Sequence, residues 1–506
     1  MSNITRRSFL QRGTAAAAAL TIVPNVVLGK AHGHIAPTDK LNIAGIGIGG
    51  MGNANLKNME TTENIVALCD IDWRYAKPVF DRHPQAKKYW DYRKMFDEMG
   101  SSIDAVLVAT ADHTHAIITA DAMTLGKHVY TQKPLTHSIY EARLLTKLAE
   151  AHPEVVTQMG NQGSSDEGTD LVTEWIWNGE IGEVTRVDCA TNRPIWPQGL
   201  NTPEKVDKVP KTMNWDLFIG PAKMRPFNMT YHPWNWRGWW DFGTGALGDM
   251  ACHIMDPVYW ALDLKYPTSV IGSSTLSNLY SPPHAQVVTY TFPARKPKGN
   301  VKMPEVKVYW YDGGLMPPRP EELKDGQMMG DENGGLLFIG TKGKIMTGCY
   351  GMNPTLLPVT DMDHFNQPKP TIPRVKGGNG NIWDTNAHEQ DWIRACKESP
   401  ENRREASSNF QFSGPFNEMV VMGVLAVRLS GLQGLHRELQ WDGENMRFTN
   451  ISPTDKIKIV TVDDFKVIDG DPRFDRRFAE FSALEMANEW IKHTYQNGFT
   501  LPDMPK

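Results

Sequence analysis

The chain has 506 residues, too many for one ordinary hydrophobic core, so we expect at least two domains. Hydrophobic residues make up 40% of it, with 43 glycines and 34 prolines, which is typical of a loop-rich globular protein and excludes fibrous and disordered classes. The formal net charge of −5, without a long basic run, gives no support to a nucleic-acid-binding surface. A small-molecule partner fits this composition better.

The cysteines are too few and too scattered to form a disulfide framework or a Cys-x-x-Cys metal site. There are five of them: Cys69, Cys189, Cys252, Cys349 and Cys396. The stability of the fold must therefore come from its core.

The first residues have the pattern of an export signal. Thr5-Arg6-Arg7-Ser8-Phe9-Leu10 precedes a run of small and apolar residues that ends near Leu28 and is too rich in alanine for a stable membrane span. This pattern resembles a twin-arginine signal, and the alternative is an Arg-Arg pair before an amphipathic helix. We expect a signal peptide over 1–31 and a periplasmic or otherwise exported protein. That route carries folded proteins, so a cofactor would be exported with the chain and would have to be held tightly.

Apolar runs alternate with helical stretches over 38–160. Strands are predicted at 41–46, 64–70, 103–110 and 128–131, and helices at 51–59, 115–125 and 140–151. Continuous apolar strands that alternate with helices indicate a parallel sheet covered on both faces, which is the Rossmann arrangement.

A glycine-rich segment follows the first of these strands. Gly45, Gly47 and Gly50 satisfy the pattern G-x-G-x-x-G, in which glycines allow a tight turn and close approach of the backbone to a diphosphate. Asp70 ends the second strand, where a carboxylate can bind the ribose hydroxyls of a dinucleotide and repel a 2′-phosphate. NAD is therefore favoured over NADP, although the nearby Arg74 keeps NADP open. Thr110, at the end of the third strand, is a further candidate for cofactor binding.

Residues 104–135, which read DAVLVATADHTHAIITADAMTLGKHVYTQKPL, resemble the glucose-fructose oxidoreductase, inositol dehydrogenase and rhizopine catabolism (Gfo/Idh/MocA) family. The resemblance covers about 40–450. It continues through Gln158–Gly163, Asn192-Arg193-Pro194, Trp236–Trp240 and Gly248–His253. It implies an α/β Rossmann domain followed by an α+β domain whose open, mostly antiparallel sheet carries the substrate face.

The family signature is Glu-Lys-Pro, and its lysine reaches the reacting carbon beside the nicotinamide. This chain has Gln132-Lys133-Pro134, so the lysine is kept while the carboxylate before it is replaced by a neutral amide. From the residues alone, Lys133 could be an exposed cation at a strand end. Ligands of parallel sheets lie at this carboxyl edge, which favours a role in cofactor binding and catalysis.

Asp249 and His253 are the second group of candidate functional residues, after Lys133. In a helix their i, i+4 spacing places both side chains on one face, where the carboxylate can orient the imidazole and raise its basicity. The spacing alone is equally compatible with a helix amino terminus capped by Asp249 and a half-buried His253. The resemblance implies that these two residues are the catalytic pair.

After Gly160 the pattern changes to separated strands, predicted at 184–193, 268–274, 286–292, 306–311 and 336–347, and we assign 161–450 to a substrate-binding domain. A long aromatic loop lies between the first of these strands and Asp249. Its aromatic rings can stack on sugar C–H faces, while its polar side chains can bind hydroxyls. The candidate substrate residues are Arg193, Tyr231, His232, Trp236 and Arg237, with further tryptophans at 196, 234, 239 and 240. The alternative is that these tryptophans belong to the core or to an oligomer contact.

Two further segments are assigned less specifically. His113 and His115 suggest a metal site, but no third ligand has suitable spacing, so packing is favoured and no metal is expected. Residues 451–506 are a C-terminal extension with an amphipathic helix near 481–495 that could pack across the domains. His388 and Glu389 are weaker candidates for the substrate pocket.

These features together predict an exported NAD(P)-dependent oxidoreductase that removes hydride from a hydroxyl-bearing carbon of a sugar or glycoside. Two alternatives remain open. One is a redox-neutral glycosidase that acts through a transient keto sugar, and the other is a sugar-binding protein without catalysis. The expected partner is a carbohydrate rather than nucleic acid or membrane, and we expect a homo-oligomer.

Overall fold

The computed structural model describes residues 39–506 apart from 379–381, 383–384 and 432–436. The predicted signal peptide lies outside the described residues. Within the described ranges, none of the helices combines the length and the apolar character that crossing a membrane requires.

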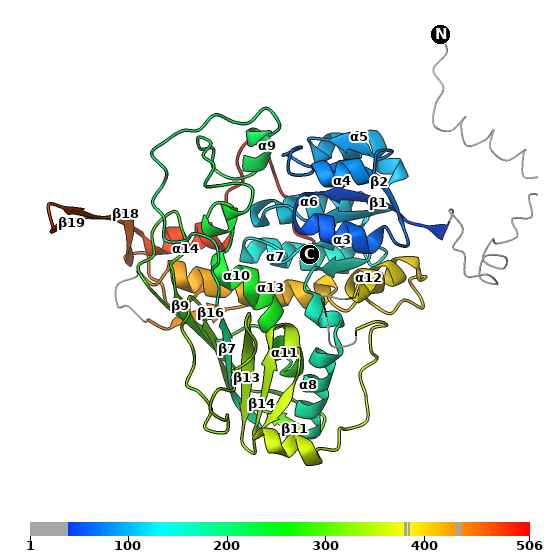
Figure 1. The fold of residues 1–506 in the computed structure, drawn as a ribbon, viewed down its shortest axis with the longest axis vertical. Coiled ribbons are helices and arrows are strands. Elements are labelled where there is room, and N and C mark those ends of the chain that lie inside the picture. The colour runs from blue at the N-terminus through cyan, green and yellow to red at the C-terminus, as the bar shows by residue number, and fades with distance from the viewer. Residues whose placement is uncertain (1–38, 379–381, 383–384, 432–436) are drawn as a thin grey trace, which may run out of the picture. The chain divides into compact units, whose positions relative to one another are not determined.

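The amino-terminal part of the described chain, called the Rossmann half below, is built on a six-stranded sheet in which all neighbouring strands are parallel, in the order β3-β2-β1-β4-β5-β6. The strands are β1 Asn42–Ile46, β2 Asn64–Cys69, β3 Lys87–Tyr89, β4 Ala105–Val108, β5 His128–Thr131 and β6 Thr157–Met159. The helices between and after them are α3 Met51–Met59, α4 Lys77–Arg82, α5 Tyr92–Met99, α6 Asp112–Thr124 and α7 Ile139–Ala151. The predicted Rossmann arrangement is confirmed (Figure 1).

The burial of these strands follows from their sequence. All four residues of β4 are buried, as expected of a central parallel strand covered on both faces. Two strands of this sheet were not predicted from the sequence, β3 and β6, and they lie at its edges and have only three residues each. Runs this short carry too little periodicity to be recognised.

The second half is built on a nine-stranded sheet, in the order β15-β14-β13-β7-β12-β9-β8-β16-β17, with β7 and β12 as its parallel pair. The strands are β7 Val184–Thr191, β8 Ser269–Ser274, β9 Gln286–Phe292, β12 Val306–Tyr311, β13 Gly334–Gly340, β14 Lys344–Gly348, β15 Thr355–Leu357, β16 Leu439–Asp442 and β17 Arg447–Phe448. A separate small hairpin joins β10 Arg295–Lys298 to β11 Val301–Met303. The mostly antiparallel sheet is therefore confirmed.

One predicted strand is wrong in its extent. The segment 336–347 is not one strand but parts of two, because β13 and β14 pair antiparallel across a turn at 341–343. Gly343 in this turn was the sequence signal for the break. Along β9, buried and half-buried residues alternate, which marks one face packed on the core and one face open.

The second half also contains helices. They are α8 Glu167–Asn178, α9 Trp215–Ile219, α10 Gly245–Ile254, α11 Asp256–Ala261, α12 Ala387–Lys397 and α13 Phe410–Arg428. Short 3-10 helices lie along the whole described chain, at η3 Gly100–Ser102, η4 Gln162–Ser165, η5 Asn235–Gly238, η6 Cys349–Gly351 and η7 Val359–His364. Although α12 and α13 come after β15 of the second sheet in sequence, α12 packs on α3, and α13 packs on both α7 and the strands β8 and β9.

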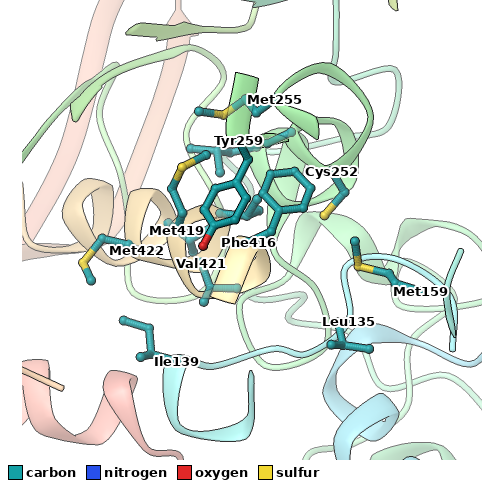
Figure 2. Packing of buried hydrophobic residues seen from close by; sticks show 14 of the residues in the cluster. Leu135, Ile139, Met159, Cys252, Met255, Tyr259, Phe416, Met419, Val421 and Met422 are labelled. Atoms are coloured by element: carbon teal, nitrogen blue, oxygen red, sulfur yellow. The ribbon is translucent and has the colours of Figure 1, made fainter. Parts of the chain in front are cut away.

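One hydrophobic cluster extends through both halves. Figure 2 shows Leu135, Ile139 and Met159 of the Rossmann half near side chains of α10, α11 and α13, among them Cys252 and Phe416. Since the halves share a continuous core, the ends of their strands and helices are held in fixed positions relative to one another.

The C-terminal extension contains more structure than the single helix that was predicted. A long hairpin of β18 Lys456–Ile468 and β19 Asp471–Ser482 precedes α14 Ala483–Ile491. Beyond α14 the chain lies on the Rossmann half, where Tyr495 donates a 2.8 Å hydrogen bond to Glu141 and the rings of His493 and His137 stack. Phe499, near the end of this segment, reaches the main cavity.

Candidate active site

A single cavity extends from the glycine-rich loop after β1 to side chains of the second half. Its floor is the carboxyl edge of the parallel sheet, where Ile46, Cys69 and Ala109 lie at or just beyond strand ends. The second half contributes residues of the loop after β7, of the aromatic loop and of α10. Open parallel sheets bind ligands at this edge, so the cavity is the candidate active site.

The glycine loop uses a register two residues later than predicted. Gly45 lies inside β1, pairs with Leu68 and Leu107, and is absent from the cavity lining. The turn residue is Gly47, whose φ of 78° favours glycine. A Cβ on Gly52 would lie 2.2 Å from the carbonyl oxygen of Gly47, so only glycine allows the helix to pack this closely. The same G-x-G-x-x-G pattern is met by Gly47, Gly49 and Gly52, which puts these glycines at the turn, at the cavity and at the helix contact.

Asp70 lies where the motif predicted a carboxylate, directly after β2. Its Oδ2 accepts hydrogen bonds from the backbone N–H groups of Ile48 and Gly49, at 2.8 and 3.1 Å. Burial raises the pKa of Asp70 to about 6, while the hydrogen bonds from Asp72 and Ile48 oppose this rise. Thr110 also lines the cavity and accepts a 2.7 Å hydrogen bond from Thr114.

Lys133 and Asp249 meet inside the cavity, although they are 116 residues apart. The ammonium of Lys133 donates to the Asp249 carboxylate at 2.9 Å and to its backbone oxygen at 2.8 Å. The guanidinium of Arg237 donates to the same carboxylate oxygen at 3.0 Å. Burial raises the pKa of Asp249, but the two cations outweigh it and hold this pKa well below its usual range. The Asp249 carboxylate is therefore ionised at the centre of a three-residue ion cluster.

His253 lies on the same helix as Asp249, as the spacing predicted, but it is not oriented by that carboxylate in the structure. Two cations compete for the carboxylate, and charge-assisted hydrogen bonds are stronger than one to a neutral imidazole. Nδ1 of His253 is buried and has no hydrogen-bond partner among the described residues, and its ring centroid lies 4.5 Å from that of Tyr350. Burial, followed by the charge of Lys133, lowers the pKa of His253 well below its usual value, so the imidazole is neutral at pH 7. Helix α10 begins at Gly245, so Asp249 is not its cap.

The aromatic loop divides into residues that line the cavity and residues that support the fold. Trp196, Trp234 and Trp236 line the cavity and surround Arg237, whose guanidinium lies 4.2 Å from the centroid of Trp236. Tyr231 was predicted to bind substrate, but it is 2% exposed and packs in an aromatic cluster with Trp239.

The three polar residues proposed for hydroxyl binding have different partners. Arg237 is bound to Asp249, as described above. His232 lines the cavity, and its Nε2 lies 3.2 Å from a carboxylate oxygen of Asp72, which connects the aromatic loop to the Rossmann half. Arg193 lies in the loop after β7 and lines the cavity, and its guanidinium donates to the side-chain oxygens of Asn192 and Asn333.

Gln132 stands where the family signature has glutamate. Its amide donates a 2.9 Å hydrogen bond to Asn55, and Asn55 donates a 2.7 Å bond to the buried carboxylate of Glu389 on α12. Burial raises the pKa of Glu389. The neutral amide thus joins a hydrogen-bond network between the two halves, and Glu389 acts there rather than in the main cavity.

The histidines at the start of α6 contact backbone oxygens. The ring nitrogens of His113 lie 2.9 and 3.3 Å from the carbonyl oxygens of Phe218 and Phe242, and those of His115 lie 2.8 and 3.0 Å from the carbonyl oxygens of Pro134 and Thr110. No cluster of three or more potential metal ligands is found in the part of the chain that the structure describes.

Sequence reasoning missed several residues of the cavity. Tyr75 packs on the glycine loop, Tyr350 contacts the His253 ring, and Phe499 closes part of the cavity from the C-terminal extension. Gly49 and Gly52 could have been found from the sequence, because it also contains the second register of the glycine motif. The aromatic residues could not, because only the fold brings them to the cavity.

Comparison with known families agrees with this geometry. A family model described as "Oxidoreductase family, NAD-binding Rossmann fold" matches residues 41–159. A second one, for the C-terminal alpha/beta domain of the same oxidoreductase family, matches residues 182–275. Two models of the Gfo/Idh/MocA oxidoreductase family thus match this chain, one in each half. The resemblance predicted from residues 104–135 is therefore confirmed.

Curated relatives match less than a third of this chain. Inositol 2-dehydrogenase from Burkholderia multivorans is 29% identical over 154 residues, which are 30% of this chain and 45% of the relative. Inositol 2-dehydrogenase/D-chiro-inositol 3-dehydrogenase from Lacticaseibacillus casei is 31% identical over 141 residues, which are 27% of this chain and 40% of the relative. The chain thus spans less than half the length of the curated relatives that it matches.

Solved structures share the fold. The WlbA dehydrogenase from Chromobacterium violaceum, in complex with NADH and UDP-GlcNAcA, has a TM-score of 0.53 and 15% identity over 80% of this chain and 96% of that one. GenD2 from gentamicin A biosynthesis, in complex with NAD, has a TM-score of 0.52 and 17% identity over 80% of this chain and 97% of that one. At these identities the likeness concerns the fold alone.

The glycine loop after β1 fits the diphosphate of NAD. Helix α3 begins next to the cavity without a side-chain cap and without an acidic residue in its first turn. Uncapped backbone N–H groups at a helix amino terminus bind phosphate oxygens. The ionised form of Asp70 suits ribose hydroxyls and disfavours a 2′-phosphate.

The shifted glycine register can be tested with two alanine substitutions. We expect Gly52→Ala to lose bound NAD, because its Cβ would meet the backbone oxygen of Gly47 at 2.2 Å and displace the turn. Gly50→Ala is the matched control. Its Cβ would find the hydroxyl of Tyr75 at 3.2 Å as its nearest neighbour, and its φ is −103°. NAD released from each purified protein by denaturation is measured by mass spectrometry. If both variants lost bound NAD equally, the assignment of the motif to Gly47, Gly49 and Gly52 would be contradicted.

Proposed function

We propose that this chain is an exported NAD-dependent oxidoreductase that oxidises a hydroxyl group of a sugar or glycoside. One observation supports it above the others: a cation of the Rossmann half, Lys133, meets α10 of the second half inside the cavity that begins at the glycine loop. The relatives named inositol 2-dehydrogenase act on a ring alcohol, which agrees with this substrate class.

The side chains provide the groups that the oxidation of an alcohol needs. When bound, NAD supplies the acceptor for the hydride that leaves the alcohol carbon. Lys133 has three N–H donors, of which two bind Asp249, and the third can bind the substrate oxygen. His253 is neutral and lines the cavity, so it can accept the proton of the hydroxyl group. Asp249 positions Lys133 and Arg237, and Trp234 and Trp236 present apolar faces to a sugar ring.

Export and tight cofactor binding are part of the same proposal. The twin-arginine-like pattern at Arg6 and Arg7 supports export with the cofactor already bound. The C-terminal segment would retain the cofactor, because Phe499 lines the cavity and lies 4.6 Å from the guanidinium of Arg93. A homo-oligomer also remains a prediction, which light scattering of the purified protein measures.

The purified protein tests the proposal in one experiment. It is mixed with sugars and glycosides, while absorbance at 340 nm follows reduction of the bound nicotinamide and chromatography follows the sugar products. We expect a stoichiometric rise in absorbance and an oxidised sugar. Release of free sugar from a glycoside without lasting reduction would replace the oxidoreductase by the redox-neutral glycosidase. If sugars bind without either reaction, the protein is a sugar-binding protein.

A further inference from the structure

The substrate end of the cavity holds more positive than negative charge. Three permanent or strongly basic cations line it, Lys133, Arg193 and Arg237, and one carboxylate, that of Asp249, lies among them. The two other carboxylates in the cavity lining, Asp70 and Asp91, are on the Rossmann half and have their own partners, the glycine-loop N–H groups and Arg93.

Arg193 is the cation of this group that lacks a carboxylate. Its guanidinium donates to the amide oxygens of Asn192 and Asn333, and no ion pair involving it occurs among the described residues. A guanidinium has five N–H donors, so three remain for a ligand. Lys133 and Arg237, in contrast, share the Asp249 carboxylate.

The position of Arg193 is fixed before any ligand binds. It stands two residues after the end of β7, and Asn333 stands one residue before β13, the antiparallel neighbour of β7. Thr191 and Asn192 donate hydrogen bonds to the backbone oxygens of Asn333 and Glu332, which closes this corner of the sheet. The neutral amides thus orient the guanidinium and leave its charge uncompensated. This arrangement suits a site in which two parallel N–H groups of the guanidinium bind one anion.

We propose that the substrate is an anionic sugar, whose carboxylate or phosphate group is bound by the guanidinium of Arg193. The inference rests on the proposed function, because it takes the cavity at Lys133 and His253 as the substrate site. The anion compensates the excess positive charge of the cavity. The carboxylate or phosphate group of the sugar must lie on the side of the ring that faces the loop after β7. Arg193 is therefore a specificity residue, and it takes no part in the proton or hydride steps.

Binding to the holoenzyme tests the inference separately from catalysis. Quenching of tryptophan fluorescence gives the Kd for glucose, galactose and mannose, for their uronates and for their 6-phosphates. We expect at least one charged sugar to bind tenfold or more tightly than its neutral parent, with a Kd that rises with salt concentration. The uronate and phosphate arms show which anion is preferred. Absorbance at 340 nm in the same samples reports the oxidoreductase activity. A failure of the proposed function is therefore seen independently of the binding preference.

Two arginine substitutions complete the design. Arg193→Gln should abolish the preference for the charged sugar, and Arg193→Lys should restore part of it, since lysine keeps the charge without the fork geometry. Arg186→Gln is the matched control, because Arg186 lies on β7, the strand that precedes Arg193, but pairs with Asp188 outside the cavity lining. The inference is overturned if no charged sugar binds more tightly than its neutral parent, or if Arg193→Gln keeps the preference.

Discussion

Replacing Lys133 by methionine should lower the rate of nicotinamide reduction by about 10³-fold, within the range found for positioned proton-transfer and hydrogen-bonding groups. Methionine keeps most of the aliphatic length of the side chain and removes the ammonium that binds Asp249 and that the proposed mechanism places on the substrate oxygen. The glycine loop and Asp70 are unchanged, so the amount of bound NAD should stay near that of the wild-type protein.

The matched control is Lys127→Met, which removes the same charge at the opposite end of β5. Its rate should equal that of the wild-type protein. Single-turnover reduction is followed at 340 nm, with the released nucleotide quantified in parallel. If Lys133→Met reduced its nicotinamide as fast as Lys127→Met, Lys133 would be a structural cation and the proposed mechanism would be wrong.

The position of Lys133 could be predicted from sequence, while its partners could not. A buried strand, the motif after it and the carboxyl edge of a parallel sheet together locate Lys133, because βαβ units allow few topologies. Its contact with Asp249 spans 116 residues and depends on how α10 packs on the shared core. Local patterns contain no information about such a distance.

The errors have local physical causes. The glycine motif was read two residues early because Gly45, Gly47 and Gly50 match the same pattern as Gly47, Gly49 and Gly52, and only the end of β1 at Ile46 separates the two readings. Tyr231 was assigned to the cavity because it adjoins loop residues that do line it. In an irregular loop neither period of 2 nor period of 3.6 tells which aromatic ring turns inward.

The role expected for Asp249 changed for an electrostatic reason. Its predicted position on one helix with His253 is confirmed, since both residues lie on α10. Spacing on a helix shows which side chains share a face, but the choice of partner depends on charges from other elements. Here Lys133 and Arg237 supply two cations, and the carboxylate pairs with them instead of the imidazole.

This arrangement predicts that Asp249 matters more for stability than Lys133 does. Asp249→Asn leaves two largely buried cations without a counter-charge, and breaking such a pair costs about 3–5 kcal/mol of unfolding free energy. Lys133→Met leaves Asp249 still paired with Arg237, so its loss should be smaller. Asp249→Asn should therefore be less stable than Lys133→Met. The opposite order would be expected if Lys133 were the main structural partner.

Chemical denaturation followed by tryptophan fluorescence measures these losses, with Asp442→Asn as the control for an exposed carboxylate that pairs with Arg447. That control should unfold at nearly the wild-type denaturant concentration. The double variant Lys133→Met/Asp249→Asn should lose less than the sum of the single losses, because methionine removes one of the two unpaired cations. Strict additivity, or an Asp249→Asn protein as stable as the wild type, would mean that the carboxylate does not hold the two cations together. In that case the positioning of Lys133 would have to come from the backbone oxygen of residue 249, which Lys133 contacts at 2.8 Å.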